Sequence, residues 1–461
     1  MLQRPPLRIR VRTKPPVSRH PTATHPMDSF IIKGGRPLRG TVRINGAKNA
    51  CLPLMAAALL TDQPVTLRGV PALSDVRSME KLLATLGCEL TAEGTTRTLR
   101  GTDDSKNTAD YDLMRTMRAG ICTLGPLVAA RGTATVSMPG GCAIGDRPVD
   151  LHLRGLRALG AQITLEAGYI TAKAPADNGG RLRGGHIFLG GPNGSTALGT
   201  ANVMSAAALA TGVTVIECAA CEPEIEDVGR LLIAMGAKIT GLGSPRITIE
   251  GVDQLGGATH DVIPDRIEAG TYVMAAAITG GDVVLENFPT ITLGAALDRL
   301  NEVGVNVRPD DVESVFVPGM HDTVRVHAAR RFNPVQVVTQ PHPGFPTDLQ
   351  AQMMALLTVA DGNAIVTEKI FPDRFLHVAE LLRMGADITR VGPSAMITGV
   401  RELVGAPVMC SDLRASAGLV IAGLAARGTT TLNRVYHLDR GYETMEVTLQ
   451  KLGAEIERVK E

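Results

Sequence analysis

A short phrase that recurs six times is the feature that most constrains the fold of this chain. The phrase runs from a leucine-rich segment through a glycine to a small, a polar and an apolar residue. Its copies are LATLGCEL, LRALGAQI, LIAMGAKI, LNEVGVNV, LLRMGADI and LQKLGAEI, with their central glycines at Gly87, Gly160, Gly236, Gly304, Gly385 and Gly453. Successive glycines lie 68 to 81 residues apart. A sustained period of this kind is typical of a fold built from repeated supersecondary units.

Each copy of the phrase lies in a larger common pattern. The glycine follows an amphipathic run such as DVGRLLIAMG, so we predict that it ends a helix in the left-handed conformation and that a strand begins directly after it. A short β-branched strand such as PVTLRGV precedes each amphipathic run, and a segment of small apolar residues such as GTANVMSAAALATG precedes that strand. These apolar segments have little polar face, which predicts helices buried on all sides.

The predicted fold class is α/β, with two domains and buried central helices. A chain of 461 residues exceeds one ordinary core, and six units divide naturally into two groups of three. We expect one three-repeat domain over residues 47–256, which carries the loop around Cys142, and a second over 27–46 plus 257–461. Ligands commonly bind in clefts between domains, so functional residues are expected on the loops that face such a cleft.

Residues 1–26 differ from the rest. They hold six Lys or Arg, six Pro and no acid, which indicates a disordered or mis-called leader ahead of a second start at Met27; a functional basic arm is the alternative.

Charge and composition exclude several classes of function. The remaining residues carry 41 basic against 46 acidic side chains, and aromatic residues make up 3% with no Trp, so nucleic-acid binding is not expected. No apolar run approaches the length of a membrane span or a signal core, which predicts a cytoplasmic protein. Seven cysteines are few and odd in number, as for reduced thiols. CAAC at 218–221 has the spacing of a redox pair or half a zinc site, but it has no second pair, so no metal is expected.

Polar residues that the repeats do not share are candidates for chemistry. They fall at the starts of the buried helices, namely Lys48 and Asn49 in NGAKNA, Arg118 in MRAG, Asp348 in PTDLQ and Arg414 in SDLRAS, and in strand-to-helix loops, namely Arg147, Arg374 and Arg440. Brought together at one cleft, the cations would form a strong site for phosphate and carboxylate. The alternative is that each arginine pairs with the acid near it in sequence, at Asp146, Asp373, Asp412 or Asp439.

Two further residues stand out for other reasons. Asp348 could cap its helix, or it could accept a proton from a substrate hydroxyl; the sequence leaves both open. Cys142 lies among glycines in SMPGGCAIGDRPVDL, a segment too rich in glycine for a regular element, which indicates an exposed and reactive thiol on a loop.

Several motifs together carry a family resemblance. NGAKNA, MRAG, MPGGCAIGDRPVDLH, EPEIED, FPTDLQAQ, DLRAS and YHLDRGYE occur in this order over residues 27–461. They closely resemble the enolpyruvyl transferases, in particular those that act on UDP-N-acetylglucosamine. The resemblance implies two inside-out α/β barrels of three repeats each. It also implies transfer of the enolpyruvyl group of phosphoenolpyruvate to the 3′-hydroxyl of the sugar, by addition and elimination with release of phosphate. Neither a metal nor an organic cofactor is implied.

The resemblance also implies roles for individual residues. Those expected to contact phosphoenolpyruvate are Lys48, Asn49, Arg147, Arg374, Arg414 and Arg440. Those expected to contact UDP-N-acetylglucosamine are Asn49, Arg118, Arg147, Pro148, Val149, Asp150, Leu151, Asp348 and Ile370. Cys142, Asp348, Lys48 and Arg440 are implied to be catalytic, with Asp348 as the base for the 3′-hydroxyl. Cys142 resembles the mobile-loop cysteine that fosfomycin alkylates.

Two alternatives remain beside this hypothesis. One is the related transferase that acts on shikimate 3-phosphate, which lacks the PGGCAIG loop. The other is an inactive paralogue that binds the sugar nucleotide and regulates peptidoglycan synthesis. In each case the partners are small molecules, and a monomer is expected.

Overall fold

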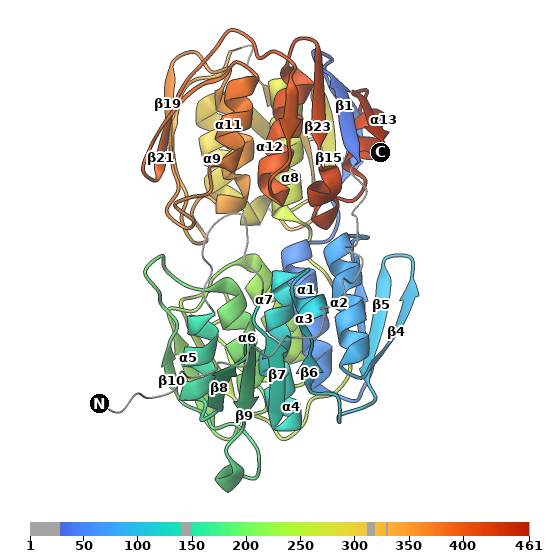
Figure 1. The fold of residues 1–461 in the computed structure, drawn as a ribbon, viewed down its shortest axis with the longest axis vertical. Helices are drawn as coiled ribbons and strands as arrows, with labels where there is room; N and C mark the ends of the chain where they lie inside the picture. The colour runs from blue at the N-terminus through green and yellow to red at the C-terminus, as the bar shows by residue number, and fades with distance from the viewer. Residues whose placement is uncertain (1–27, 140–148, 311–318, 329–330, 461) are drawn as a thin grey trace, which may run out of the picture.

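Two groups of elements, each around its own apolar core, make up the molecule (Figure 1). The structure is a computed structural model that describes residues 28–139, 149–310, 319–328 and 331–460. Buried apolar residues in these ranges form two clusters. One runs from Ala47 to Ile263, and the other combines Phe30 to Ile44 with Ile267 to Ile456. The predicted domain boundaries stay a proposal; the two clusters divide the chain in a similar way, but the first one extends past residue 256 to Val262 and Ile263.

The first cluster is covered by three four-stranded sheets. Their orders are β14 (Ala258–Asp261), β3 (Val65–Arg68), β5 (Thr96–Gly101), β4 (Cys88–Glu93); β6 (Thr108–Ala109), β7 (Thr133–Ser137), β9 (Tyr169–Lys173), β8 (Gln162–Glu166); and β10 (His186–Phe188), β11 (Val213–Glu217), β13 (Arg246–Glu250), β12 (Lys238–Thr240). In each sheet the first two strands are parallel and the other neighbours antiparallel.

Three more sheets of the same kind cover the second cluster. Their orders are β2 (Arg39–Arg43), β15 (Asp282–Phe288), β17 (Asp322–Ala328), β16 (Val305–Pro309); β18 (Gln336–Val338), β19 (Asn363–Thr367), β21 (Ser394–Thr398), β20 (Asp387–Val391); and β22 (Pro407–Met409), β23 (Thr429–Asn433), β1 (Ser29–Lys33), β24 (Glu455–Val459). The parallel pair again comes first in each order.

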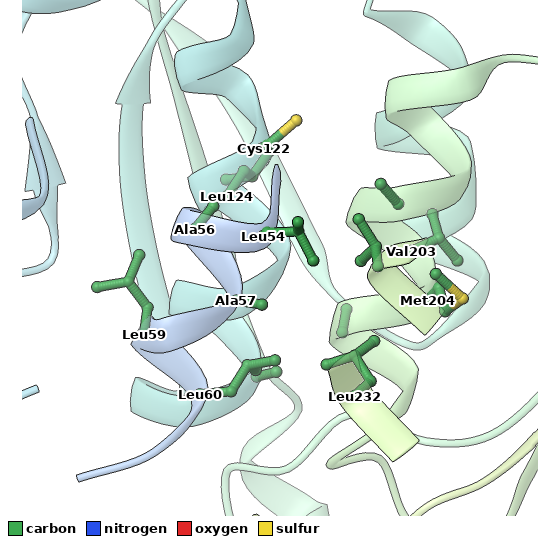
Figure 2. Packing of buried hydrophobic residues seen from close by; sticks show 14 of the residues in the cluster. Leu54, Ala56, Ala57, Leu59, Leu60, Cys122, Leu124, Val203, Met204 and Leu232 are labelled. Atoms are coloured by element: carbon green, nitrogen blue, oxygen red, sulfur yellow. The ribbon is translucent and has the colours of Figure 1, made fainter. Parts of the chain in front are cut away.

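Helices of small and apolar residues fill the centre of each group. In chain order they are α1 (Lys48–Ala57), α4 (Leu124–Arg131), α6 (Ala197–Ala207), α8 (Arg266–Ile278), α10 (Gln350–Leu357) and α12 (Leu413–Ala425). Almost all of their residues are buried. Figure 2 shows Leu54 of α1, Val203 of α6 and Leu232 of a neighbouring helix within one cluster. Because sheets lie outside and helices inside, each group is an inside-out α/β barrel, and the predicted fold class is confirmed.

The amphipathic helices also lie where the repeats predict them. They are α2 (Ser74–Thr85), α5 (Asp150–Ala158), α7 (Pro223–Ala234), α9 (Gly294–Val303), α11 (Leu376–Arg383) and α13 (Met445–Lys451). Short helical segments complete the helices: η1 (Ala58–Leu60), α3 (Tyr111–Met114), η2 (Arg118–Thr123), η3 (Ala176–Asn178), η4 (Thr290–Thr292), η5 (Thr347–Leu349) and η6 (Val435–Arg440). The six repeat glycines all have a left-handed φ, between 80° and 108°, and a strand follows each of them within two residues. The predicted left-handed conformation of these glycines and the predicted strand after each of them are therefore confirmed.

The chain passes twice between the two groups, and the two connecting segments lie side by side and are antiparallel at Gly46 and Pro264. Ala47 N donates to the Ile263 carbonyl at 2.7 Å, and Asp265 N donates to the Asn45 carbonyl at 2.8 Å. A Cβ at Gly46 would lie 2.0 Å from the carbonyl oxygen of residue 69, so only glycine allows this close approach. Strand β14 follows residue 256 and pairs with β3 of the first group, while β1 and β2 pair within the second.

None of the helices in the described ranges is long and apolar enough to cross a membrane.

Candidate functional site

The starts of buried helices from the two groups meet between them (Figure 1). Asn49 in the first turn of α1 donates its side-chain amide to Asp348 Oδ2 at 3.3 Å, although 299 residues separate the two. The backbone N–H of Lys48 donates to Asp265 Oδ2 at 3.3 Å, while Oδ1 of the same carboxylate caps α8. Helix N-termini carry partial positive charge and unpaired N–H groups, so this meeting point favours an anionic ligand.

Asp348 lies at the centre of one ionic cluster. Arg374 Nη1 donates to its Oδ1 at 2.8 Å, and Arg414 Nε donates to its Oδ2 at 3.3 Å. The two arginines are almost fully buried, while the Asp348 side chain keeps 26% of its surface exposed. The carboxylate is therefore held in a fixed orientation and still reaches the space between the groups.

Asp75 holds a second pair of cations and links the two groups. Lys48 Nζ lies 2.8 Å from Asp75 Oδ2, and Arg440 Nε lies 3.0 Å from Asp75 Oδ1. Asp75 belongs to α2 of the first group, and Arg440 ends η6 of the second. No sequence pattern singles out Asp75, because an acid in the first turn of an amphipathic helix is ordinary there.

Burial and neighbouring charges together shift the pKa values of Lys48 and Asp75. Burial lowers the pKa of Lys48; Asp75 raises it, but the nearby Arg440 and Arg414 add to the lowering, and the net shift is downward. Burial alone would raise the pKa of Asp75, but Lys48 and Arg440 outweigh that effect and lower it. Asp75 is therefore an ionised carboxylate that holds Lys48 and Arg440 near each other.

The acids that are near the arginines in sequence have other partners. Asp373 pairs with Arg390 at 2.8 Å, and Asp439 pairs with Arg458 at 2.7 Å. Asp412 caps the backbone of α12. Pairing with adjacent acids is therefore wrong as an explanation of Arg374, Arg414 and Arg440, which are directed at Asp348 and Asp75.

Arg414 is held between Asp348 and Tyr442. Its guanidinium lies over the ring of Tyr442, with 5.4 Å from Cζ to the ring centroid. Its Nη1 and Nη2 are buried and meet no acceptor of good geometry among the described residues, although the Tyr442 hydroxyl is close enough to interact with the guanidinium. Buried guanidinium donors of this kind are costly, so an anion that reached them would be bound.

The residues expected at the sugar nucleotide form a second area. Val149 precedes α5, whose first three residues are Asp150, Leu151 and His152. Burial, with the positive charge of Arg118 adding to it, lowers the pKa of His152 to about 4. Arg118, at the start of η2, is therefore near His152. His152 is a neutral residue there, hydrogen-bonded through Nδ1 to the Asn202 amide at 3.0 Å.

Of the remaining expected residues, the structure describes only Ile370. Ile370 is half-buried, and its backbone N–H donates to Glu368 Oε1 at 2.8 Å, close to the start of η5. Cys142, Arg147 and Pro148 lie outside the described residues, so their predicted roles stay predictions. In the part of the chain that the structure describes, no cluster of three or more His, Cys, Asp or Glu could hold a metal ion.

Comparison with known proteins identifies the family to which this chain belongs. A family model described as EPSP synthase (3-phosphoshikimate 1-carboxyvinyltransferase) matches residues 32–449. The chain belongs to this family, whose enzymes carry out carboxyvinyl, or enolpyruvyl, transfer.

Curated relatives define the similarity more narrowly. A protein of Magnetococcus marinus is 51% identical over 94% of this chain and 100% of its own length, and one of Dinoroseobacter shibae is 52% identical over the same shares. Both are named UDP-N-acetylglucosamine 1-carboxyvinyltransferase.

Solved structures share the fold at low sequence identity. The enolpyruvyl transferase NikO from Streptomyces tendae has a TM-score of 0.82 and 24% identity, covering 95% of this chain and 100% of its own. EPSP synthase from Acinetobacter baumannii has a TM-score of 0.72 and 20% identity, covering 94% and 100%.

Proposed function

We propose that this protein transfers the enolpyruvyl group of phosphoenolpyruvate to the 3′-hydroxyl of UDP-N-acetylglucosamine, with release of phosphate. The product is the first committed intermediate of peptidoglycan synthesis. The observation that carries the proposal is the set of four cations, Lys48, Arg374, Arg414 and Arg440, held by two carboxylates where the two groups meet. The relatives at about half identity over nearly the whole chain support the same reaction.

The cations match the charge of phosphoenolpyruvate. That substrate carries a phosphate and a carboxylate, and guanidinium groups hold both by paired hydrogen bonds. Lys48 and Arg440 would hold phosphoenolpyruvate and the departing phosphate, while Arg414 Nη1 and Nη2 would donate hydrogen bonds to one of its anionic groups. Such fixed positive charge stabilises the charge that develops during transfer, because the site does not have to reorganise.

Asp348 is the proposed base. Its carboxylate is held by Asn49, Arg374 and Arg414 and remains partly exposed. A carboxylate in this position would accept the proton of the 3′-hydroxyl as the oxygen attacks C2 of phosphoenolpyruvate, while the methylene carbon gains a proton. The resulting tetrahedral ketal then loses phosphate together with one proton of its methyl group, which restores the double bond and gives the enolpyruvyl ether.

The sugar nucleotide is proposed to lie against the first group. Arg118 and Arg147, with residues 148–151, would contact it there, while Asn49, Asp348 and Ile370 would contact its sugar from the interdomain side. Cys142 is proposed to close over the substrates as a proton donor. Reaction in the cytoplasm, by a monomer, completes the proposal.

The first experiment measures phosphate release from phosphoenolpyruvate with two acceptors. Release with UDP-N-acetylglucosamine, but not with shikimate 3-phosphate, is the expected result. Pretreatment with fosfomycin should abolish release and label the protein, whereas Cys142→Ser should prevent the labelling. Release with shikimate 3-phosphate alone would contradict the proposed acceptor. A protein that binds UDP-N-acetylglucosamine but releases no phosphate would be the inactive paralogue.

A further inference from the structure

A buried carboxylate beside the site has no role in the steps described above. Glu368 follows strand β19, and its side chain is fully buried. Its Oε1 accepts hydrogen bonds from the backbone N–H groups of Ile370 and Phe371 at 2.8 and 2.9 Å, and from Thr339 Oγ1 at 2.7 Å. Its Oε2 accepts from Thr347 Oγ1 at 2.9 Å. Four donors satisfy a buried charge that would otherwise be costly.

The Thr347 hydroxyl connects this carboxylate to the site. It donates its one proton to Glu368, so its lone pairs are left to accept. Arg374 Nη1 donates to Thr347 Oγ1 at 3.0 Å and to Asp348 Oδ1 at 2.8 Å. The same guanidinium nitrogen thus joins the Thr347 hydroxyl to the carboxylate proposed as the base.

We propose that Glu368 is a positioning residue for the transfer reaction, acting through Thr347 and Arg374 on Asp348. Only an acceptor at the Oε2 position keeps the Thr347 proton turned away from Arg374. A hydroxyl that donates to a carboxylate is also a better acceptor, because hydrogen bonds in a chain polarise one another. The expected change in kcat rests on the proposed function. The expected position of Arg374 relative to Thr347 does not depend on it.

Replacement by glutamine tests the direction of these hydrogen bonds. In Glu368→Gln the amide oxygen would take the position of Oε1, where three donors converge, and the amide nitrogen would face Thr347. The Thr347 proton then loses its acceptor and competes with Arg374 Nη1. A hydrogen bond to a charged group supports roughly a tenfold change in rate, so kcat should fall about tenfold, with the KM for UDP-N-acetylglucosamine within about twofold.

The fold supplies a matched control on the same carboxylate. Thr339 also donates to Glu368, but its hydroxyl accepts from the backbone N–H of Lys369 at 2.9 Å and not from a side chain of the site. Thr339→Val removes one donor from Glu368 and disturbs the same turn. Both Thr339→Val and Glu368→Gln should lower the melting temperature. Thr339→Val should leave kcat within about twofold of the wild type.

Variants of Thr347 complete the test. Thr347→Val should reproduce the loss of kcat, and Thr347→Ser, which keeps the hydroxyl, should restore kcat to within about twofold of the wild type. The double variant Glu368→Gln/Thr347→Val should be no slower than Thr347→Val by more than about twofold, because both changes break one chain of contacts. The proposal would be overturned if the fold-loss of kcat in the double variant equalled the product of the two single losses. It would also be overturned if Thr339→Val lost as much kcat as Glu368→Gln.

Crystal structures of Glu368→Gln and Thr339→Val separate this inference from the proposed function. Arg374 Nη1 should leave Thr347 in the first variant and stay in the second. An unmoved Arg374 in Glu368→Gln would overturn the inference even in a fully active enzyme. Absence of phosphate release by the wild type would reject the proposed function, while these two structures would still decide the positioning role.

Discussion

At the scale of single residues, the site depends on carboxylates that arrange cations. Asp75 and Asp348 each hold two of them, and neither has a sequence neighbourhood that reveals its partners. Replacing one member of a buried ionic cluster leaves the others uncompensated, which is strongly destabilising. Replacing either carboxylate should therefore affect both the stability of the protein and the positions of the two cations that it holds.

Asp75→Asn should impair both stability and turnover. Loss of the charge leaves Lys48 and Arg440 without their shared carboxylate, at a cost of about 3 kcal/mol in the free energy of unfolding and about tenfold or more in kcat. Urea denaturation and phosphate release measure the two effects. Asp373→Asn is the control, because Asp373 pairs with Arg390 at the surface, with 79% of its side chain exposed. Equal effects of the two changes would contradict the role of Asp75.

Glu268 should make stability depend on pH. Burial raises the pKa of this carboxyl to about 8 from an ordinary 4.5, with the charge of Asp265 adding to the shift and the hydrogen bonds from Asn45 opposing it. Between these values the unfolded chain releases the proton and the folded protein keeps it, so the free energy of unfolding falls as pH rises through this window.

Glu268→Gln removes this titration. Its free energy of unfolding should fall less than that of the wild type between pH of about 5 and about 8. Denaturation by urea at several pH values measures the difference, in which the titration of all other groups largely cancels. Parallel curves for the two proteins would show that Glu268 is ionised in the folded state over this range.

At the scale of elements, the repeat glycines give each unit its turn from helix to strand. Gly385 has a φ of 87°, and a Cβ there would meet open space. The need for glycine is thus conformational and not steric. All six repeat glycines share a left-handed φ, which explains why the phrase recurs so regularly; at Gly87 a Cβ would in addition collide with the carbonyl oxygen of Asp103.

Gly385→Ala should therefore destabilise the protein by about 1 kcal/mol, the cost of a left-handed alanine. Gly385→Asn should cost less, since asparagine tolerates this region. Gly294→Ala is the control, because Gly294 begins α9 without a left-handed φ and also faces open space. That change should be neutral or stabilising. Urea denaturation of the three variants would contradict the interpretation if Gly385→Ala and Gly294→Ala behaved alike.

At the scale of the whole molecule, polar contacts join two separate apolar clusters. Beside the Arg440 and Asp75 pair, Glu443 Oε2 accepts from the backbone N–H of Ala72 at 2.8 Å. Domains that meet through polar contacts commonly move relative to each other. A ligand held by residues of both groups would then couple their stabilities.

Hydrogen exchange under increasing urea should show two units in the free protein. Amides of α6, in the first cluster, and of α12, in the second, should open at different urea concentrations. Saturating UDP-N-acetylglucosamine should protect both, by about 2.7 kcal/mol at a concentration of one hundred times the Kd. Opening of α6 and α12 as one unit in the free protein would contradict this prediction.

Local patterns in the sequence were enough to determine the repeating units. Buried helices, outer helices and the glycines that end them follow from apolar periodicity and from the backbone freedom of glycine, which depend on neighbouring residues alone. The candidates Lys48, Asn49, Asp348, Arg374, Arg414 and Arg440 were also found in this way, since a charge at the start of an apolar helix, or recurring in equivalent loops, needs an explanation.

Only the tertiary structure decided which charges meet. Asp75 and Arg440 are 365 residues apart, and Asn49 and Asp348 are 299 apart; Glu368 follows a strand of ordinary sequence. Their contacts arise because β1 and β2 complete the second barrel while β14 completes the first, which sends the chain twice across the interface. Local periodicity encodes burial, but an ionic partner is fixed by chain topology, and no short stretch of sequence contains it.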